Sequence, residues 1–347
     1  MKTITRKHSI PHFTSKQLKD YFGNMRVGVF DIETLGLKPD ICSMVLAGFM
    51  TIDEDGCCVL KQYFAETPED EKLIIEQLKV DFANVDYLFT YNGKHFDIPF
   101  VLKRASKWDI LDFDVSLYNL DLYLILNGHS EVKYLLENLK QKTVETYMGL
   151  SIKRDDVISG AESIKLYNAY STAINQEIKS KLENKILLHN HDDLLQLYQL
   201  LPIIKQVNIH KAFYHLGFPI LRKNGWPTLN ITSLKVSNLG LSISGKYVGE
   251  KFSYISYDSF DKHFFCEFKE DGTFNFNLHT DKHKGNIFIN LPLFFENYDD
   301  FKKFPNYIKS FLLISNNNMI SHMEVNAFTK KFISDFMDNT ICPLSIL

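Results

Sequence analysis

Three short stretches of the 347-residue chain carry polar residues whose types and spacing suit chemistry. The first is Phe30–Leu37 (FDIETLGL), in which Asp31 and Glu33 are two positions apart after an apolar run. Because side chains alternate along a strand, both carboxylates would point to one face. Neighbouring carboxylates repel unless a cation lies between them, and hard divalent cations prefer oxygen ligands. Taken alone, however, the pattern more often marks a strand that ends in an exposed turn.

The second stretch is Tyr91–Arg104 (YNGKHFDIPFVLKR). Asp97 stands where a helix should begin, with Pro99 in the first turn, so its carboxylate has the position of an ordinary helix cap. Asn92 and Gly93 are ordinary turn residues when each is taken singly. These simple explanations account for the individual residues but not for their joint pattern.

The third stretch is His189–Asp193 (HNHDD), a polar island within the apolar run KILLHNHDDLLQLYQLL. On a helix, His189 and Asp193 are four positions apart and share a face. His191 lies roughly 200° around the helix from His189 and points elsewhere. Burying such an island is costly unless its groups are hydrogen-bonded. By itself, the pattern fits a solvated stripe or a hydrogen-bonded core histidine as well as it fits a functional site.

Together the three stretches resemble the motifs of the DnaQ-like DEDD 3′–5′ exonuclease superfamily, which has the ribonuclease H-like fold. The first is similar to its opening F-D-I-E-T motif. The second is similar to the N-x-x-x-F-D-x-P-[FY]-L element of family B polymerase exonuclease domains, except that Val101 separates Phe100 from Leu102. The sequence most resembles YprB-type ribonuclease-H-like proteins, whose third motif reads H-N-x-x-D and whose linker is similar to Arg154–Tyr167.

The resemblance implies two divalent cations, Mg²⁺ or Mn²⁺, as cofactors. Asp31, Glu33 and Asp193 would ligate the ion that activates water. Asp31 would also ligate the second ion, with help from Asp97. In such a site one ion lowers the pKa of the attacking water and the other stabilises the leaving 3′ oxygen.

The resemblance also implies a general base one turn before Asp193. Members of the superfamily carry either Tyr-x-x-x-Asp or His-x-x-x-x-Asp in the third motif, and here His189 occupies the tyrosine spacing. The other register would put Leu188 at the histidine position and is rejected. His189 would therefore take the proton from water, for which the ordinary histidine pKa near 6.5 is suitable.

By the same resemblance, the partner is a nucleic acid with a free 3′ end. Residues that would contact the terminal nucleotide, a phosphate or a ribose are Thr34, Leu35, Leu37, Asn92 and Lys94, with Arg104 as a weaker candidate. For Lys94 and Arg104, simple exposure to solvent is an equally good explanation.

The elements that must position these residues alternate between strand and helix. The expected strands are Arg26–Phe30, Cys42–Ile52, Cys57–Phe64 and Tyr87–Tyr91, and the expected helices are 68–82, 96–106 and most of 134–207. Another strand or helix is expected near Val115–Leu126. A three-strand meander followed by β-α alternation predicts an α/β domain with a mixed sheet and helices on its faces. The resemblance covers residues 20–207 and makes this the ribonuclease H-like domain.

The sequence of residues 208–347 follows a different pattern. Short aromatic and β-branched runs separated by Gly, Asn and Asp predict a smaller antiparallel β domain, whose role is unknown, with a helical tail over 299–337. Its aromatic residues are Trp226, Tyr247, Phe252, Tyr254, Tyr257, Phe264, Phe265, Phe268, Phe274 and Phe276. Packing in a core is favoured over stacking on single-stranded nucleic acid as their function.

Composition narrows the class of protein. Lys and Arg total 39 and Asp and Glu 42, so the net charge of −3 excludes a histone-like polycation. The 5 cysteines include no C-x-x-C pair, which argues against a disulfide scaffold or zinc knuckle. The opening MKTITRKHSIPHF has no apolar segment typical of a signal peptide, and no run of about 18 apolar residues suggests a membrane span. A cytoplasmic location is expected, and no protein partner can be inferred.

The leading hypothesis is a metal-dependent 3′–5′ exonuclease that hydrolyses phosphodiester bonds of DNA or RNA. A catalytically idle domain that only binds nucleic acid is one alternative, although the presence of all four acids argues against it. A phosphodiesterase acting on very short oligonucleotides is another.

Overall fold

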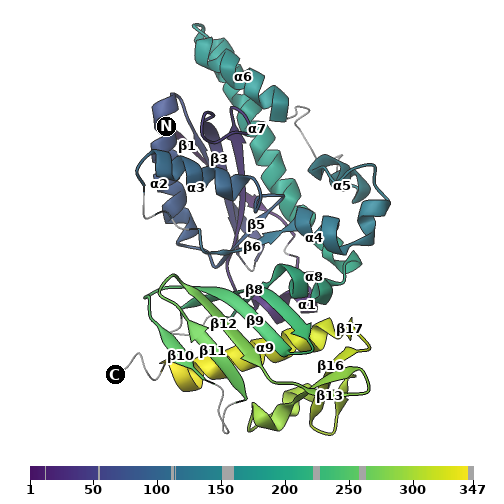
Figure 1. Cartoon of the computed structure of the whole chain (residues 1–347). Coiled ribbons are helices and arrows are strands. Elements are labelled where there is room, and N and C mark those ends of the chain that lie inside the picture. The colour runs from purple at the N-terminus through teal and green to yellow at the C-terminus, as the bar shows by residue number, and fades with distance from the viewer. Residues whose placement is uncertain are drawn as a thin grey trace. The chain divides into compact units, whose positions relative to one another are not determined.

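The computed structural model describes the chain except for residues 12, 54, 111–112, 114, 151–159, 222–226, 258–262 and 343–347. Trp226 and the start of the segment that resembles a linker, from Arg154, lie outside the described residues. Within the described part the chain forms two compact units (Figure 1). The first contains Met1–Ser15 and Asn24–Val207, and the second contains Lys16–Gly23 and Asn208–Leu347.

The first unit is built on a mixed sheet ordered β1-β4-β3-β2-β5-β6. Its strands are β1 (Lys2–Ser9), β2 (Val27–Thr34), β3 (Met44–Ile52), β4 (Cys57–Phe64), β5 (Tyr87–Thr90) and β6 (Tyr118–Asp121). The pairs from β1 to β2 are antiparallel, whereas β5 pairs in parallel with both β2 and β6. Strand β1 was not predicted, because its polar sequence KTITRKHS lacks an apolar run; such sequences are typical of edge strands.

Helices cover both faces of this sheet (Figure 1). They are α2 (Glu71–Phe82), α3 (Asp97–Lys107), α4 (Leu122–His129), α5 (Gln141–Tyr147), α6 (Gly160–Thr172) and α7 (Gln176–Gln199). The 3-10 turns η1 (Pro68–Asp70), η2 (Glu131–Tyr134) and η4 (Leu201–Gln206) accompany them. The predicted α/β fold, a mixed sheet flanked by helices, is confirmed.

Alternation along β2 decides what each face receives. Phe30 and Ile32 join the buried cluster that contains the apolar side of α2 and part of α3. Asp31 and Glu33 point to the other face, where both contact side chains of α7. The strand period of two therefore delivers a pair of carboxylates to α7 without disturbing the core beneath α2.

The second unit contains α1 (Lys16–Phe22), α8 (Ile209–Leu216), α9 (His322–Phe336) and the π-helical turn η7 (Met337–Ile341). One antiparallel sheet, ordered β10-β11-β12-β9-β8-β7, consists of β7 (Phe218–Ile220), β8 (Thr228–Ser237), β9 (Gly240–Val248), β10 (Tyr254–Ser256), β11 (Phe264–Phe268) and β12 (Thr273–Leu278). Another contains β13 (Asp281–His283), β14 (Asn286–Asn290), β15 (Tyr307–Ile308), β16 (Phe311–Asn316) and β17 (Met319–Ile320), with η5 (Leu291–Leu293) and η6 (Asp299–Phe301) beside it. The predicted antiparallel β part is confirmed.

The expectation of a helical tail over 299–337 was wrong in its first half. Phe311–Asn316 (FLLISN) is β16, and its apolar residues alternate too little to be told from a helical segment by pattern alone. Aromatic residues of the sheet fill the core: Phe268 and Phe276 are fully buried, and Phe276 packs 5.0 Å from Phe336 of α9. Among the described residues, no helix has both the length and the apolar character that a membrane crossing requires.

The N-terminal helix α1 belongs to the second unit because of Tyr21. Its buried ring lies 4.4 Å from the ring of Phe213 in α8, and its hydroxyl accepts a hydrogen bond from Asn326 of α9 at 2.8 Å. Lys330 of α9 also donates to the main-chain oxygen of Asp20. These long-range contacts place residues 20–23 with the second unit, although the resemblance in sequence began the first domain at residue 20.

A buried ion pair ties α2 and α3 to the loop after β2. Glu71 and Arg104 are almost completely buried, with two hydrogen bonds between their side chains. Glu71 also accepts from Trp108 Nε1 and from the main-chain N–H of Met44 at 2.7 Å, while Arg104 donates to the main-chain oxygen of Pro39. Arg104 is therefore a buried structural residue, and the alternative that it is simply exposed to solvent is wrong.

Replacement of Glu71 by Ala should lower the free energy of unfolding by about 3–5 kcal/mol, because it leaves the Arg104 guanidinium buried without its partner. Chemical denaturation followed by tryptophan fluorescence would measure the change, since Trp108 itself bonds to Glu71. Glu76→Ala is the matched control on the exposed side of α2 and should change stability by no more than about 0.5 kcal/mol. Equal effects of the two substitutions would contradict the role of the pair.

Candidate active site

The candidate site lies where neighbouring parallel strands end. Asp31 and Glu33 lie near the end of strand β2. Strand β5 ends at Thr90, seven residues before helix α3 begins at Asp97. Strand β6 ends at Asp121, directly before α4. The carboxyl ends of adjacent parallel strands are the usual position for ligand sites in α/β sheets, because loops and helix N-termini gather there.

Glu33, His189 and Asp193 form the centre of the cluster. His189 Nε2 lies 3.7 Å from Glu33 Oε1 and 3.6 Å from Asp193 Oδ2. One ligand atom from each of these side chains can be chosen so that all lie within 4.8 Å of one another. Glu33 and His189 are buried and Asp193 is partly accessible, so the group opens on the side of Asp193.

Asp31 is held by a residue that sequence reasoning missed. Asn190 Nδ2 donates to Asp31 Oδ2 at 2.9 Å, and Asn190 Oδ1 accepts from Gln62 Nε2 at 2.9 Å. Both amide side chains are fully buried. A side chain at Gly48 of β3 would place its Cβ only 2.2 Å from Asn190 Oδ1, so glycine is required there. The polar island of α7 thus contributes Asn190 as well as His189 and Asp193.

The surroundings of Asp31 disfavour its charged form. Burial of the carboxylate and the nearby charges of Asp97, Asp193 and Glu33 raise its pKa well above the ordinary value. The hydrogen bond from Asn190 acts in the opposite direction and lowers the pKa. The carboxylates predicted to act together are therefore close enough to repel one another.

Asp97 is buried beside β2. Its Oδ1 accepts a hydrogen bond of 3.2 Å from the main-chain N–H of Ile32, the residue between the two acids of β2. Burial raises the pKa of Asp97 to about 7. Hydrogen bonds from its own N–H and from Ile32 lower the pKa, whereas the charges of Asp121 and Glu33 raise it.

Asp121 is a further buried carboxylate that sequence reasoning missed. It accepts from the main-chain N–H groups of Asn92 at 2.9 Å, Lys94 at 3.0 Å and Leu124 at 3.2 Å. Burial raises its pKa and these bonds lower it. The bond to Leu124 caps α4, and the other two hold the turn before α3. An aspartate at the end of a strand, directly before an apolar helix, was the signal that could have identified this cap.

The residues predicted to contact substrate lie in two loops. Thr34 donates from Oγ1 to the main-chain oxygen of Gly36 at 2.9 Å, and Leu35 packs partly against the core beside α7. Leu37 is 82% exposed. In the other loop, Asn92 has a left-handed backbone with φ of 62° and Lys94 is exposed. The structure brings together the acids and His189, whereas Leu37 and Lys94 are exposed.

These residues fit a divalent cation. The donor set is dominated by carboxylate oxygens, which Mg²⁺ and Mn²⁺ prefer. The mutual repulsion that raises the pKa of Asp31 would be relieved by a cation between the acids. Asp31, Glu33, Asp97 and Asp193 are the residues that would hold such ions.

The raised pKa of Asp97 predicts how stability depends on pH in the absence of metal. The folded chain favours the protonated acid, so its stability should fall as pH rises from about 4 through about 7. Asp97→Asn removes the charge and keeps the acceptor for Ile32. At pH 8 in EDTA it should therefore raise the free energy of unfolding, by an amount on the order of 1–3 kcal/mol.

Below pH 4 the gain from Asp97→Asn should disappear, because wild type is then protonated in both states. Unfolding curves at both pH values measure the difference, and the exposed Asp300→Asn is the control that should change neither. Saturating Mn²⁺ should stabilise wild type more than the variant. A variant that is less stable than wild type at pH 8 would contradict the prediction.

Similarity to known proteins identifies the family of the chain. No curated protein matches the sequence. Among solved structures, a family B DNA polymerase from the hyperthermophilic archaeon Pyrobaculum calidifontis matches with 22% identity and a TM-score of 0.40, over 52% of this chain and 25% of that chain. The signature of the RNase_H superfamily matches residues 29–204, just over half of the chain and the part that contains Asp31 to Asp193. The chain therefore belongs to the RNase_H superfamily.

Proposed function

We propose that the chain is a metal-dependent 3′–5′ exonuclease of the DnaQ-like DEDD type, similar to YprB-type proteins, acting on DNA or RNA. The observation that carries the proposal is the convergence of acidic side chains. One ligand atom each of Glu33, His189 and Asp193 lie within 4.8 Å of one another, and the charges of Asp97, Asp193 and Glu33 raise the pKa of Asp31. Carboxylates gathered at such a cost are typical of sites that bind cations for phosphoryl chemistry. Membership in the RNase_H superfamily supports a nucleic-acid hydrolase.

Each polar side chain has a proposed task. Asp31, Glu33, Asp97 and Asp193 hold two divalent cations, Mg²⁺ or Mn²⁺. When bound, these ions would lower the pKa of the attacking water and neutralise charge on the leaving 3′ oxygen. His189, adjacent to Asp193 and Glu33, accepts the proton of the attacking water.

The substrate is proposed to enter with its 3′ end towards the loop after β2. Thr34 and Leu35 would contact the terminal nucleotide, and the exposed Leu37 would lie beside the last base. Asn92 and Lys94 would contact a phosphate or a ribose. The turn that presents them is held by Asp121, so its position relative to Asp97 is defined by backbone hydrogen bonds.

Strands labelled at the 5′ end should be shortened stepwise in Mg²⁺ or Mn²⁺ when they carry a free 3′-OH, whereas a 3′-phosphate should block digestion. Gel analysis of strands of graded length measures this. Asp31→Asn is the matched control and should lose nearly all activity with the fold intact. Equal digestion of blocked and free strands would indicate an endonuclease. Cleavage of only the shortest strands would indicate a phosphodiesterase, and binding without cleavage would indicate an idle domain.

His189→Ala should reduce the cleavage rate by roughly 10²–10⁴, the usual effect of losing a general base. If His189 is a base and not a ligand, affinity for Mn²⁺ should stay nearly unchanged, and calorimetry can measure this. His191→Ala is the control, because His191 instead contacts His8 at 3.1 Å and Asp192 at 2.9 Å. A large loss of Mn²⁺ affinity in His189→Ala would make the histidine a ligand and contradict the assigned role.

A further inference from the structure

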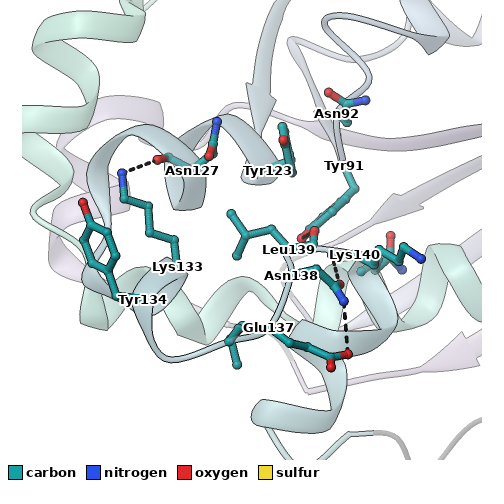
Figure 2. Close-up of a pocket in the computed structure, with 12 residues that line it drawn as sticks. Tyr91, Asn92, Tyr123, Asn127, Lys133, Tyr134, Glu137, Asn138, Leu139 and Lys140 are labelled. Atoms are coloured by element: carbon teal, nitrogen blue, oxygen red, sulfur yellow. Dashed lines mark hydrogen bonds between the residues drawn. The ribbon is translucent and has the colours of Figure 1, made fainter.

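A pocket of about 680 Å³ opens beside the candidate active site, entirely within the first unit. Its lining comes from the end of β5, from α4, from η2 and from the segment that leads into α5, and includes Asn92, Lys133, Tyr134, Glu137, Lys140 and Gln141. Figure 2 shows Lys133 and Tyr134 together on one side, with Tyr91 and Tyr123 across from them. Pockets of roughly 300–1,000 Å³ are the size that holds a small organic ligand.

Two contacts join this pocket to the site. Asn92, on the pocket wall, is held through its N–H by Asp121, whose charge also acts on Asp97. Gln141, also on the wall, donates from Nε2 to the main-chain oxygen of Asp193 at 2.9 Å. The pocket wall is therefore hydrogen-bonded both to the turn before α3 and to the main chain at Asp193.

Some of the lining is structural. The hydroxyl of Tyr91 donates to the main-chain oxygen of Leu139 at 2.6 Å, and its ring meets that of Tyr123 edge to face at 6.0 Å. These contacts hold the segment before α5 against α4 and explain why both tyrosines are only partly exposed.

Lys133 Nζ likewise donates to the main-chain oxygen of Asn127 at 2.9 Å, and Asn138 Nδ2 donates to Glu137 at 3.1 Å. The side chains of Tyr134 and Lys140 have no such structural explanation. Tyr134 is 72% exposed, and its ring is accompanied by the ammonium of Lys133, whose Nζ lies 4.9 Å from the ring centroid. Lys140 is exposed, and within the described part of the chain its ammonium has no ion-pair partner. Figure 2 shows Lys140 across the pocket from Tyr134. An accessible aromatic ring in a pocket that also contains lysines is suited to a base that stacks and a phosphate that is neutralised. The lining contains the two lysines Lys133 and Lys140 and one acid, Glu137, so its net charge is +1.

We propose that this pocket binds an unpaired nucleotide on the 5′ side of the scissile bond, with its base stacked on Tyr134 and its phosphate near Lys140. This inference rests on the proposed function, because the 3′ end is assigned to the acids and the loop after β2. A base within a duplex is stacked between its neighbours and hydrogen-bonded to its partner base. Stacking on Tyr134 therefore requires a single strand. The substrate class is therefore a strand with an unpaired 3′ segment longer than the nucleotide that is removed.

The test is binding of a fluorescent homopolymeric single strand in EDTA, followed by anisotropy. Tyr134→Ala should weaken binding roughly 5- to 100-fold, as expected for the loss of one stacked base. Tyr134→Phe should bind nearly as wild type does, because it keeps the ring. Leu135→Ala is the matched control: the residue is adjacent and 67% exposed but does not line the pocket.

Lys140→Ala should lower the slope of log Kd against log salt by about 0.7, the value for one phosphate contact on a single strand. Lys72→Ala, an exposed lysine of α2, should leave the slope unchanged. Circular dichroism of each variant checks that the fold is intact. Wild-type affinity in both Tyr134→Ala and Lys140→Ala would overturn the inference, as would an equal loss in Leu135→Ala.

Binding in EDTA does not depend on cleavage, so the two proposals fail separately. Normal cleavage of a free 3′ end, with wild-type affinity in both Tyr134→Ala and Lys140→Ala, would overturn the pocket and leave the exonuclease. Binding that depends on Tyr134, without cleavage by wild type in Mg²⁺ or Mn²⁺, would support the pocket and overturn the exonuclease.

Discussion

Repulsion among neighbouring carboxylates, two of them buried and two partly accessible, is the constraint on which the candidate site of the first unit depends. Asp31, Glu33, Asp97 and Asp193 come from β2, α3 and α7, and their gathering raises the pKa values of Asp31 and Asp97. In the absence of metal, the folded chain must offset both the cost of desolvating these carboxylates and the repulsion between their negative charges. The surrounding elements do so with directed hydrogen bonds, and Asp193 remains partly accessible.

Different acids are stabilised in different ways. Asp31 receives the amide of Asn190, which is oriented in turn by Gln62 from β4. Asp97 accepts a hydrogen bond from a main-chain N–H near the end of β2, and Asp121 accepts hydrogen bonds from main-chain N–H groups in the turn before α3. These N–H groups are fixed dipoles, so the hydrogen bonds cost no side-chain entropy on the donor side. On the opposite face of the sheet, the Glu71–Arg104 pair holds the loop that follows β2. The candidate site therefore depends on polar contacts from both faces.

The same arrangement connects the chemistry to the pocket beside it. Asp121 holds the turn that carries Asn92, and Gln141 holds the main chain of Asp193, so the pocket wall and the acids share their supports. A shift of the segment before α5 would alter the position of the acids through these hydrogen bonds. If the pocket binds a strand as proposed, these hydrogen bonds within one unit would couple its recognition to the geometry of the acids.

The sequence by itself determined the local features. Alternation in β2 put Asp31 and Glu33 on one face of that strand, and helical spacing put His189 and Asp193 on one face of α7. Apolar runs located most strands and helices of the first unit. Each of these features depends on residues that are close in the chain. Only the tertiary structure decided the rest. Asn190 and Asp121 became supports of the site, Arg104 became a buried partner of Glu71, and Tyr134 became part of a pocket. Strand β1 and the assignment of α1 to the second unit also depended on partners far along the chain. Burial and hydrogen-bond partners across long sequence separations are set by how the elements pack, and no local pattern carries that information.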